Sequence, residues 1–202
     1  MCGFTFTVFL SAFQLLPVVP YRSLALGGTA VSAGLFLGFL TYSSASTAPL
    51  TGALADRIGP RRILLIASLA IAGFSVLYGM LSSYKIMLGL VIVHGLFWSG
   101  LLSSSATYVT ALVPAERRAE GMGYWGLSTM LAVSIAPTIG LWVYTHGGWW
   151  AMCIEAAVLN IVMTGIAWAL PPDAPKATPA HPISLGRLLE WRVLLLSFSL
   201  FL

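Results

Sequence analysis

The sequence predicts an all-α membrane protein: a bundle of six transmembrane helices followed by the start of a seventh. Of its 202 residues 58% are hydrophobic and 8% are charged, whereas a soluble domain has about a quarter charged residues. A helix needs about 20 apolar residues to span a membrane, and apolar runs of roughly this length recur along the chain. The charged residues gather in the short segments between these runs, where water solvates them.

The first three spans are expected over residues 3–20, 29–55 and 63–81. In the first, Gln14 is the one strongly polar side chain, and Pro17 predicts a kink one turn later. Gln14 either faces a solute path or hydrogen-bonds a neighbouring helix. The third span is almost featureless, which favours a peripheral place.

The fourth span, expected over residues 86–113, is the most polar. Small residues recur in it every four positions and predict a helix-packing stripe: Gly95, Ser99, Ser103 and Thr107. His94 and Trp98 lie one turn apart on an adjoining side. His94 either satisfies a neighbouring polar group or exchanges a proton near neutral pH.

The fifth and sixth spans are expected over residues 120–144 and 149–170, joined by a short outside turn. The fifth carries a second small-residue stripe that ends at Gly140, with Pro137 inside it. In the sixth, Glu155 is the one acid well inside a span. Glu155 is therefore a candidate proton site, although it could equally reach interfacial water or a helix partner.

The chain divides into three parts. Residues 1–170 form the six-helix domain, and residues 171–190 form a cytoplasmic linker that is rich in proline and ends in a short amphipathic segment. Residues 191–202 begin a truncated seventh span, which is too short to cross a bilayer.

The distribution of basic residues predicts the orientation. Alternate loops hold eight bases against two, which places the amino terminus in the cytoplasm. The eight are Arg57, Arg61, Arg62, Arg117, Arg118, Lys176, Arg187 and Arg192, and the two are Arg22 and Lys85. Because these bases follow membrane topology, the expected partner is the lipid bilayer and no nucleic acid. No His, Cys, Asp and Glu cluster has metal-ligand spacing, so neither a metal nor another cofactor is expected.

The sequence GALADRIGPRR, residues 52–62, is the strongest motif. It resembles the signature loop between the second and third helices of the major facilitator superfamily, roughly G-x-L-A-D-R-x-G-R-R/K-R/K. The matching residues are Gly52, Leu54, Ala55, Asp56, Arg57, Gly59, Arg61 and Arg62. Pro60 departs from the pattern. The resemblance implies a cytoplasmic gate in which the acid pairs with an arginine and faces a helix end of the other half. The alternative is a positively charged topology anchor.

Two further stretches are similar to the same family. Residues 114–121, PAERRAEG, resemble its loop between helices 4 and 5. Residues 136–140 resemble the G-P-x-x-G-G motif of its proton-coupled exporters, in which Pro137 and Gly140 match. A kinked, tightly packed helix explains these two residues equally well. Val91 stands where many proton-coupled exporters carry an arginine.

The resemblance covers the whole chain and implies one half of a major-facilitator fold, built from two inverted three-helix repeats. It implies transport of a small solute across the plasma membrane by alternating access, with proton-coupled efflux, once a missing carboxy-terminal six-helix half is present. Gln14, His94 and Trp98 would line the solute path. The alternatives are a uniporter or symporter, or a truncated, transport-inactive membrane protein that binds a partner. No enzyme is expected, because no nucleophile, base and orienting group recur together.

Overall fold

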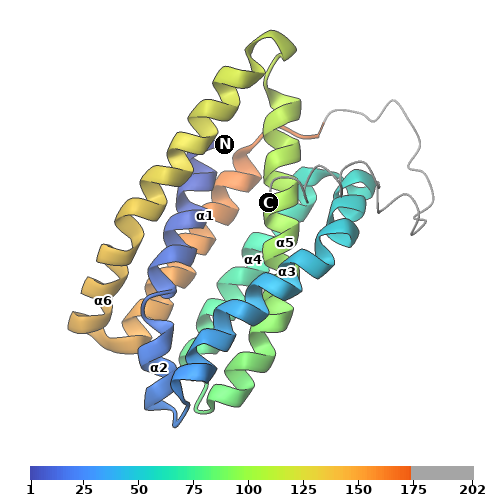
Figure 1. Cartoon of the computed structure of the whole chain (residues 1–202). Helices are drawn as coiled ribbons and strands as arrows, with labels where there is room; N and C mark the ends of the chain where they lie inside the picture. Colours follow the sequence, from blue (N-terminus) through green and yellow to red (C-terminus); the bar gives the residue numbers. More distant parts are fainter. Residues whose placement is uncertain (174–202) are drawn as a thin grey trace, which may run out of the picture.

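The computed structural model describes residues 1–173, and these residues contain helices and no strand (Figure 1). The elements are α1 (Cys2–Leu15), α2 (Val19–Ala25), α3 (Ala30–Ile58), α4 (Pro60–Met80), α5 (Tyr84–Leu112), the short 3₁₀ helix η1 (Ala115–Arg117) and α6 (Arg118–Ala169). Most of the predicted linker and the seventh span lie outside the described residues.

Four stretches of the described chain are long and apolar enough to cross a membrane, which fits a multi-pass membrane protein. They are Cys2–Ala25, Pro60–Met80, Tyr84–Leu112 and Ala115–Ala169. α3 is as long as α5 but contains many Ser, Thr and Gly residues, which lower its mean hydropathy. α6 has 52 residues, and non-helical Gly148 divides it into two arms. The predicted count of six spans therefore stays a prediction.

Proline divides the first predicted span. α1 ends at Leu15, before Pro17, and α2 then runs to Ala25 with Pro20 in its first turn. Proline has no backbone N–H to continue the helical ladder, but it fits the first turn of a helix. As a result Arg22 lies within α2 rather than in the outside loop that the sequence predicted.

Glycines with positive φ mark two other breaks. Gly59 has φ 97° and ψ 138°, and it separates α3 from α4, whose first residue is Pro60. Gly148 has φ 75°, and it joins the two arms of α6. Residues with a side chain rarely adopt a positive φ, so glycine allows the backbone to turn at both points.

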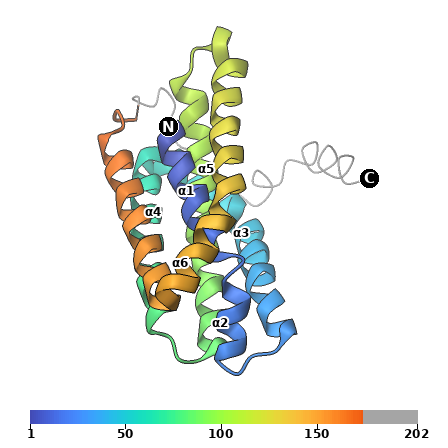
Figure 2. The ribbon, with the colours of Figure 1, turned by 90° about the vertical axis from the view of Figure 1, so that its left-hand side faces the viewer.

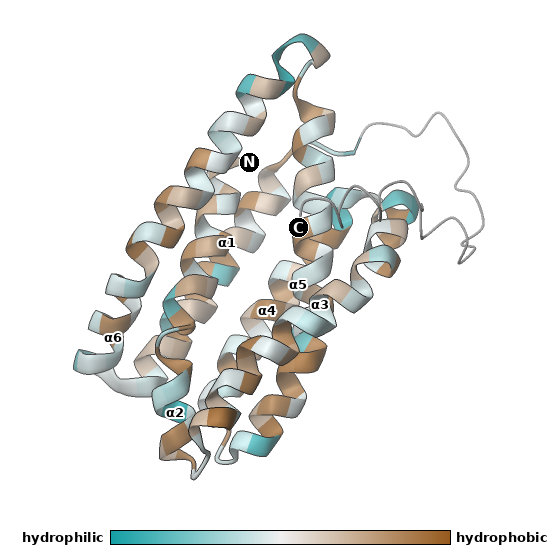
Figure 3. Ribbon diagram, viewed as in Figure 1, coloured by the Kyte–Doolittle hydropathy of each residue, from teal (hydrophilic) through white to brown (hydrophobic). Residues whose placement is uncertain are grey.

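The bundle has two ends, each with its own set of connections (Figures 1 and 2). The amino terminus, the α3–α4 loop, η1 and the carboxyl end of α6 lie at one end. The α2–α3 and α4–α5 connections and the turn at Gly148 lie at the other. Hydrophilic residues are concentrated at η1 and at the α3–α4 loop (Figure 3). The bases of those two segments thus lie at the end opposite Arg22 and Lys85, as the charge count requires.

Helix packing places α1 against α6, α3 against α5, and α4 against both α5 and α6. Two buried apolar clusters result, one around Met87, Val91 and Met152 and one around Phe4, Leu64 and Leu101. Large apolar side chains such as Trp168 are exposed on the outer surface. Such a surface is expected where a bundle meets lipid rather than water.

Candidate functional site

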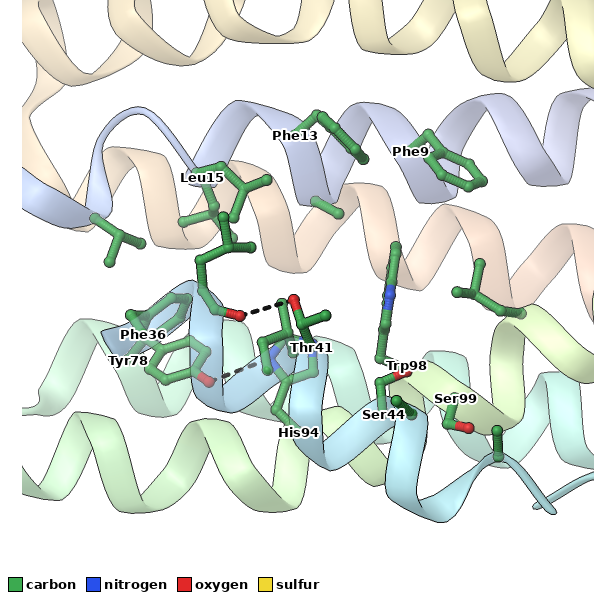
Figure 4. A pocket seen from close by; sticks show the side chains of 18 of the residues that line it. Phe9, Phe13, Leu15, Phe36, Thr41, Ser44, Tyr78, His94, Trp98 and Ser99 are labelled. Carbon is green, nitrogen blue, oxygen red and sulfur yellow. Dashed lines mark hydrogen bonds between the residues drawn. The ribbon is translucent and has the colours of Figure 1, made fainter. Parts of the chain in front are cut away.

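A cavity of about 450 Å³ lies between α1, α3 and α5 and is the candidate solute site (Figure 4). Phe9 and Phe13 of α1 face it from one side, and His94 and Trp98 of α5 line it from another. The other large side chains that line it are Leu15, Leu16, Val19, Phe36, Leu37, Leu40, Tyr78, Leu102 and Trp149, and its hydroxyls come from Thr41, Ser44, Ser99 and Ser103. No charged side chain of the described residues lines the cavity.

His94 is held in place by aromatic neighbours. Its Nδ1 lies 3.1 Å from the hydroxyl of Tyr78, and its ring stacks on Phe74 at 5.3 Å between centroids. Trp98, one turn further on, meets the ring of Phe9 edge-on at 5.9 Å. His94 and Trp98, which the sequence predicted to line a solute path, thus lie at the same cavity. Tyr78 is a polar partner of His94 that the sequence analysis did not identify.

The small-residue stripe of α5 explains how α3 closes this cavity. A Cβ atom at Gly95 would lie 2.7 Å from the Cβ of Ser43, so only glycine permits this approach. One turn on, the hydroxyls of Ser99 and Thr51 are 3.0 Å apart. The stripe therefore packs α5 on α3, in line with the packing interpretation.

Gln14 does not join His94 and Trp98 at the cavity. Its side chain is fully buried, and neither amide atom has a hydrogen-bond partner. It lies close enough to Glu155 to interact with its carboxyl, although no hydrogen bond of normal geometry joins the two groups. Glu155 itself is half-buried, and its Oε2 atom is inaccessible and unpartnered. Gln14, a candidate for the solute path, and Glu155, a candidate proton site, are thus neighbours in the structure.

The Pro137–Gly140 motif packs the first arm of α6 on α1. Gly140 is buried, and a Cβ atom there would overlap the backbone carbonyl of Gln14. Pro137 lies inside a continuous helix and lines an open surface recess together with Pro17. Gly140 therefore has a clear packing role, as the structural interpretation of this motif expects.

The signature loop is well defined within the described chain. Asp56 and Arg57 are exposed on the last turn of α3, Gly59 makes the break, and Arg61 and Arg62 lie on the first turn of α4. A Cβ atom at Gly52 would meet no atom within 4 Å, so no neighbour among residues 1–173 requires a glycine at this position.

Asp173 is the acid that meets this loop. Its Oδ1 accepts a hydrogen bond of 3.1 Å from the backbone N–H of Arg61, in the first turn of α4. The Arg61 guanidinium donates to the carbonyl of Trp168, and the Tyr108 hydroxyl donates to the carbonyl of Pro171 at 2.8 Å. The segment after α6 is thus fixed to the loop, a contact that residue spacing alone does not reveal.

A local ion pair lies where η1 meets α6. The guanidinium of Arg117 donates two hydrogen bonds of 2.9 Å to the carboxylate of Glu120. Both side chains are exposed, so the pair contributes little stability. Within residues 1–173 no group of three His, Cys, Asp or Glu residues could hold a metal ion.

Comparisons with known proteins identify the same family that the sequence motifs resemble. The family model of the Major Facilitator Superfamily matches residues 1–202. The chloramphenicol resistance protein of Pseudomonas aeruginosa is 31% identical over 160 residues, covering 78% of this chain and 38% of that protein. The multidrug export protein EmrB of Haemophilus influenzae is 24% identical over 130 residues, covering 63% of this chain and 25% of that protein. The fatty acid resistance protein FarB of Neisseria gonorrhoeae is 24% identical over 151 residues, covering 74% and 30%. The chain therefore spans well under half the length of these relatives.

Proposed function

Because this chain belongs to the Major Facilitator Superfamily, we propose that it forms the amino-terminal half of a transporter that exports a small solute by alternating access. The observation that supports this most directly is the cavity between α1, α3 and α5. Transporters of this type bind their substrates near the membrane midplane, between two six-helix halves. A partner half would complete the cavity and is not part of this sequence.

The lining of the cavity favours an uncharged, largely apolar solute with an aromatic or planar group. Phe9, Phe13 and Trp98 offer ring faces and edges, which attract aromatic partners. Tyr78 and His94 add one polar position. A fixed charge on the solute would find no opposite charge at this cavity, because no Asp, Glu, Lys or Arg is among its described lining residues.

Export coupled to protons is the proposed mode. Its support is the Pro137–Gly140 motif, the resistance and export proteins among the relatives, and two candidate proton sites at His94 and Glu155. The gate would be the Gly52–Arg62 loop, with Asp56 facing the other half. The eight-to-two distribution of bases supports a plasma-membrane protein with a cytoplasmic amino terminus.

Binding can be tested on this chain itself, because Trp98 and Trp149 line the cavity and report on an occupant. We expect chloramphenicol, the compound named in the P. aeruginosa relative, to quench tryptophan fluorescence in bilayer-reconstituted protein. The double variant Trp98→Phe, Trp149→Phe should lose this saturable quenching. Trp168→Phe is the matched control, because Trp168 is 73% exposed on the outer surface and should leave the quenching unchanged. Saturable quenching that persists in the double variant would contradict the assigned cavity.

Transport requires a second assay. The chain, expressed with and without a carboxy-terminal six-helix half from a relative, would be tested for solute flux driven by an imposed proton gradient. Flux with the second half that depends on the gradient supports proton-coupled export. Flux without gradient dependence points to a uniporter, and flux in the direction of the proton points to a symporter. Absence of flux in a correctly inserted pair would favour the partner-binding alternative.

A further inference from the structure

We propose that Arg22 is a positioning residue of the solute cavity, because it holds the indole of Trp149 in the wall that closes one end of the cavity. This end of the bundle carries the α2–α3 and α4–α5 connections and the turn at Gly148 (Figures 1 and 2). The effect on a solute rests on the proposed function, whereas the contact between the two side chains does not.

The first observation concerns the carboxyl end of α4. A helix leaves its last four carbonyls without a partner in its own backbone ladder. α4 ends at Met80, and side chains of two other elements donate to carbonyls at this end. Trp149 Nε1 donates to the carbonyl of Tyr78 at 2.9 Å. The guanidinium of Arg22 donates to the carbonyl of Leu81 at 2.8 Å, where the helix dipole favours a cation. The end of α4 thus brings Arg22 and Trp149 together.

The second observation is the direct contact between these two side chains. Arg22 Cζ lies 5.6 Å from the centroid of the Trp149 ring, within the range of a cation–π interaction. Trp149 is only 7% exposed. The Nε atom of Arg22 is inaccessible to solvent and has no hydrogen-bond partner, so the guanidinium depends on the Leu81 carbonyl and on the indole face. The indole is therefore fixed at its N–H by Tyr78 and on its face by Arg22.

The third observation is the place of this indole at the cavity. Trp149 lines the cavity together with Val19 and Tyr78. Val19 begins α2, Tyr78 lies two residues before the end of α4, and Trp149 directly follows the turn at Gly148, so all three belong to the same end of the bundle. The Tyr78 hydroxyl lies 3.1 Å from Nδ1 of His94. The contacts that start at Arg22 thus extend to the polar position of the cavity.

Three successive residues of α2 attach it to three different neighbours. The ring of Tyr21 stacks on Tyr144 of the first arm of α6 at 6.1 Å between centroids. Arg22 contacts α4 and the second arm of α6. The hydroxyls of Ser23 and Ser32 of α3 are 3.1 Å apart. Neither Tyr144 nor Ser32 is among the described residues that line the cavity. Loss of the Arg22 contact should therefore leave α2 attached and act locally on Trp149.

This arrangement makes Arg22 a determinant of how firmly the cavity is closed at the α2 end. A solute that leaves toward this end must pass the wall that Trp149 forms. Arg22 does not line the cavity itself and acts through the indole. In the proposed orientation this end is the outer one, so Arg22 would govern the release of an exported solute.

Acrylamide quenching of tryptophan fluorescence in the bilayer-reconstituted chain tests the contact without any solute. We expect Arg22→Gln to add a quencher-accessible component to the emission, because Trp149 loses its cover. The added component should disappear in the double variant Arg22→Gln, Trp149→Phe. Lys85→Gln is the matched control, because it removes the same charge from an exposed side chain at the same end and should quench like the wild type. Wild-type quenching in Arg22→Gln, or an added component that persists in the double variant, would overturn the proposal.

A conservative variant separates positioning from folding. Arg22→Lys keeps a cation, so its added component should be smaller than that of Arg22→Gln. Equal exposure of Trp149 in the two variants would contradict a cation that holds the ring. Circular dichroism on the same samples should show unchanged helical content. Loss of helix in both variants would make Arg22 a folding residue and would also overturn the positioning role.

Solute binding gives the functional readout. With Trp98 as the reporter, we expect Arg22→Gln to weaken the apparent affinity for chloramphenicol by about 2- to 5-fold, the effect of one cation–π contact. The loss should appear mainly as faster dissociation, and Lys85→Gln should bind like the wild type. Unchanged binding in an Arg22→Gln protein with exposed Trp149 would exclude Arg22 from control of the cavity. Protection of Trp149 from acrylamide in a chain that binds no chloramphenicol would support the Arg22 contact and count against the proposed solute.

Discussion

At the scale of single residues, the structure places the two candidate proton sites, His94 and Glu155, in different surroundings. His94 is bonded to Tyr78 and borders the solute cavity. Glu155 lies on another helix, opposite Gln14. The sequence identified His94, Glu155 and Gln14 as candidates because polar side chains are rare in membrane spans. It could not assign their neighbours, because those depend on how each helix is rotated about its axis.

His94 and Glu155 should therefore respond differently to substitution. In a flux-competent assembly we expect His94→Gln to weaken apparent solute affinity by about 2- to 10-fold, the equivalent of one lost hydrogen bond. Because His94 is one of the two candidate proton sites, its substitution should also flatten the pH profile. Glu155→Gln should flatten the pH profile with little change in affinity. The measurement is flux against solute concentration at several pH values, and interchanged results would reverse the two assignments.

Gly140 offers a prediction on stability. Gly140→Ala places a methyl group against the Gln14 backbone and should lower the free energy of unfolding by about 1–3 kcal/mol, the usual range for an overpacked contact. Gly126→Ala is the control on the same arm of α6, because its Cβ would meet no atom within 4 Å. Alanine there should be neutral or stabilising by up to about 1 kcal/mol. Thermal unfolding in detergent compares the two, and equal midpoints would contradict the close contact.

At the scale of helices, the sequence predicted most boundaries within a few residues because glycine and proline mark them. Gly59 and Pro60 end α3 and begin α4, and Gly148 separates the arms of α6. The first span is interrupted at Pro17, where the sequence predicted a kink, but it continues to Ala25, beyond its predicted end at Pro20. Asp173 was missed altogether, because nothing in its local sequence shows that it will reach the start of α4.

The contact of Asp173 with α4 should contribute measurably to stability. Asp173→Ala removes an acceptor and a negative charge from the first turn of a helix, which typically destabilises by about 0.5–2 kcal/mol. Asp56→Ala is the matched control, because Asp56 is exposed at the carboxyl end of α3. Chemical unfolding of the isolated chain should distinguish them. In a flux assay the order should reverse, with Asp56→Asn impairing transport more than expression if Asp56 serves the gate.

At the scale of the whole molecule, the composition was enough to predict a helical membrane protein, and the signature loop was enough to identify the family. The two-ended arrangement of the bundle agrees with the alternation of basic and nearly neutral loops. The cavity could not be predicted, since residues from α1, α3, α4, α5 and α6 meet there only after the helices pack.

The orientation of the bundle is testable by cysteine labelling in intact cells. Glu116→Cys and His146→Cys, each in a background with Cys2→Ser, place a thiol at opposite ends of the bundle. Both positions are exposed, and native Cys153 is buried. We expect a membrane-impermeant maleimide to label the second variant and not the first. The opposite labelling pattern would reverse the inferred orientation.

The attachment of Asp173 to the α3–α4 loop also sets the point from which the rest of the chain departs. This contact fixes the place at which the chain leaves the described part of the bundle. The chain beyond Asp173 therefore departs from beside Arg61 rather than from a freely moving helix end. Releasing Asp173 from Arg61 would therefore change that starting point, even though no residue of the cavity is altered.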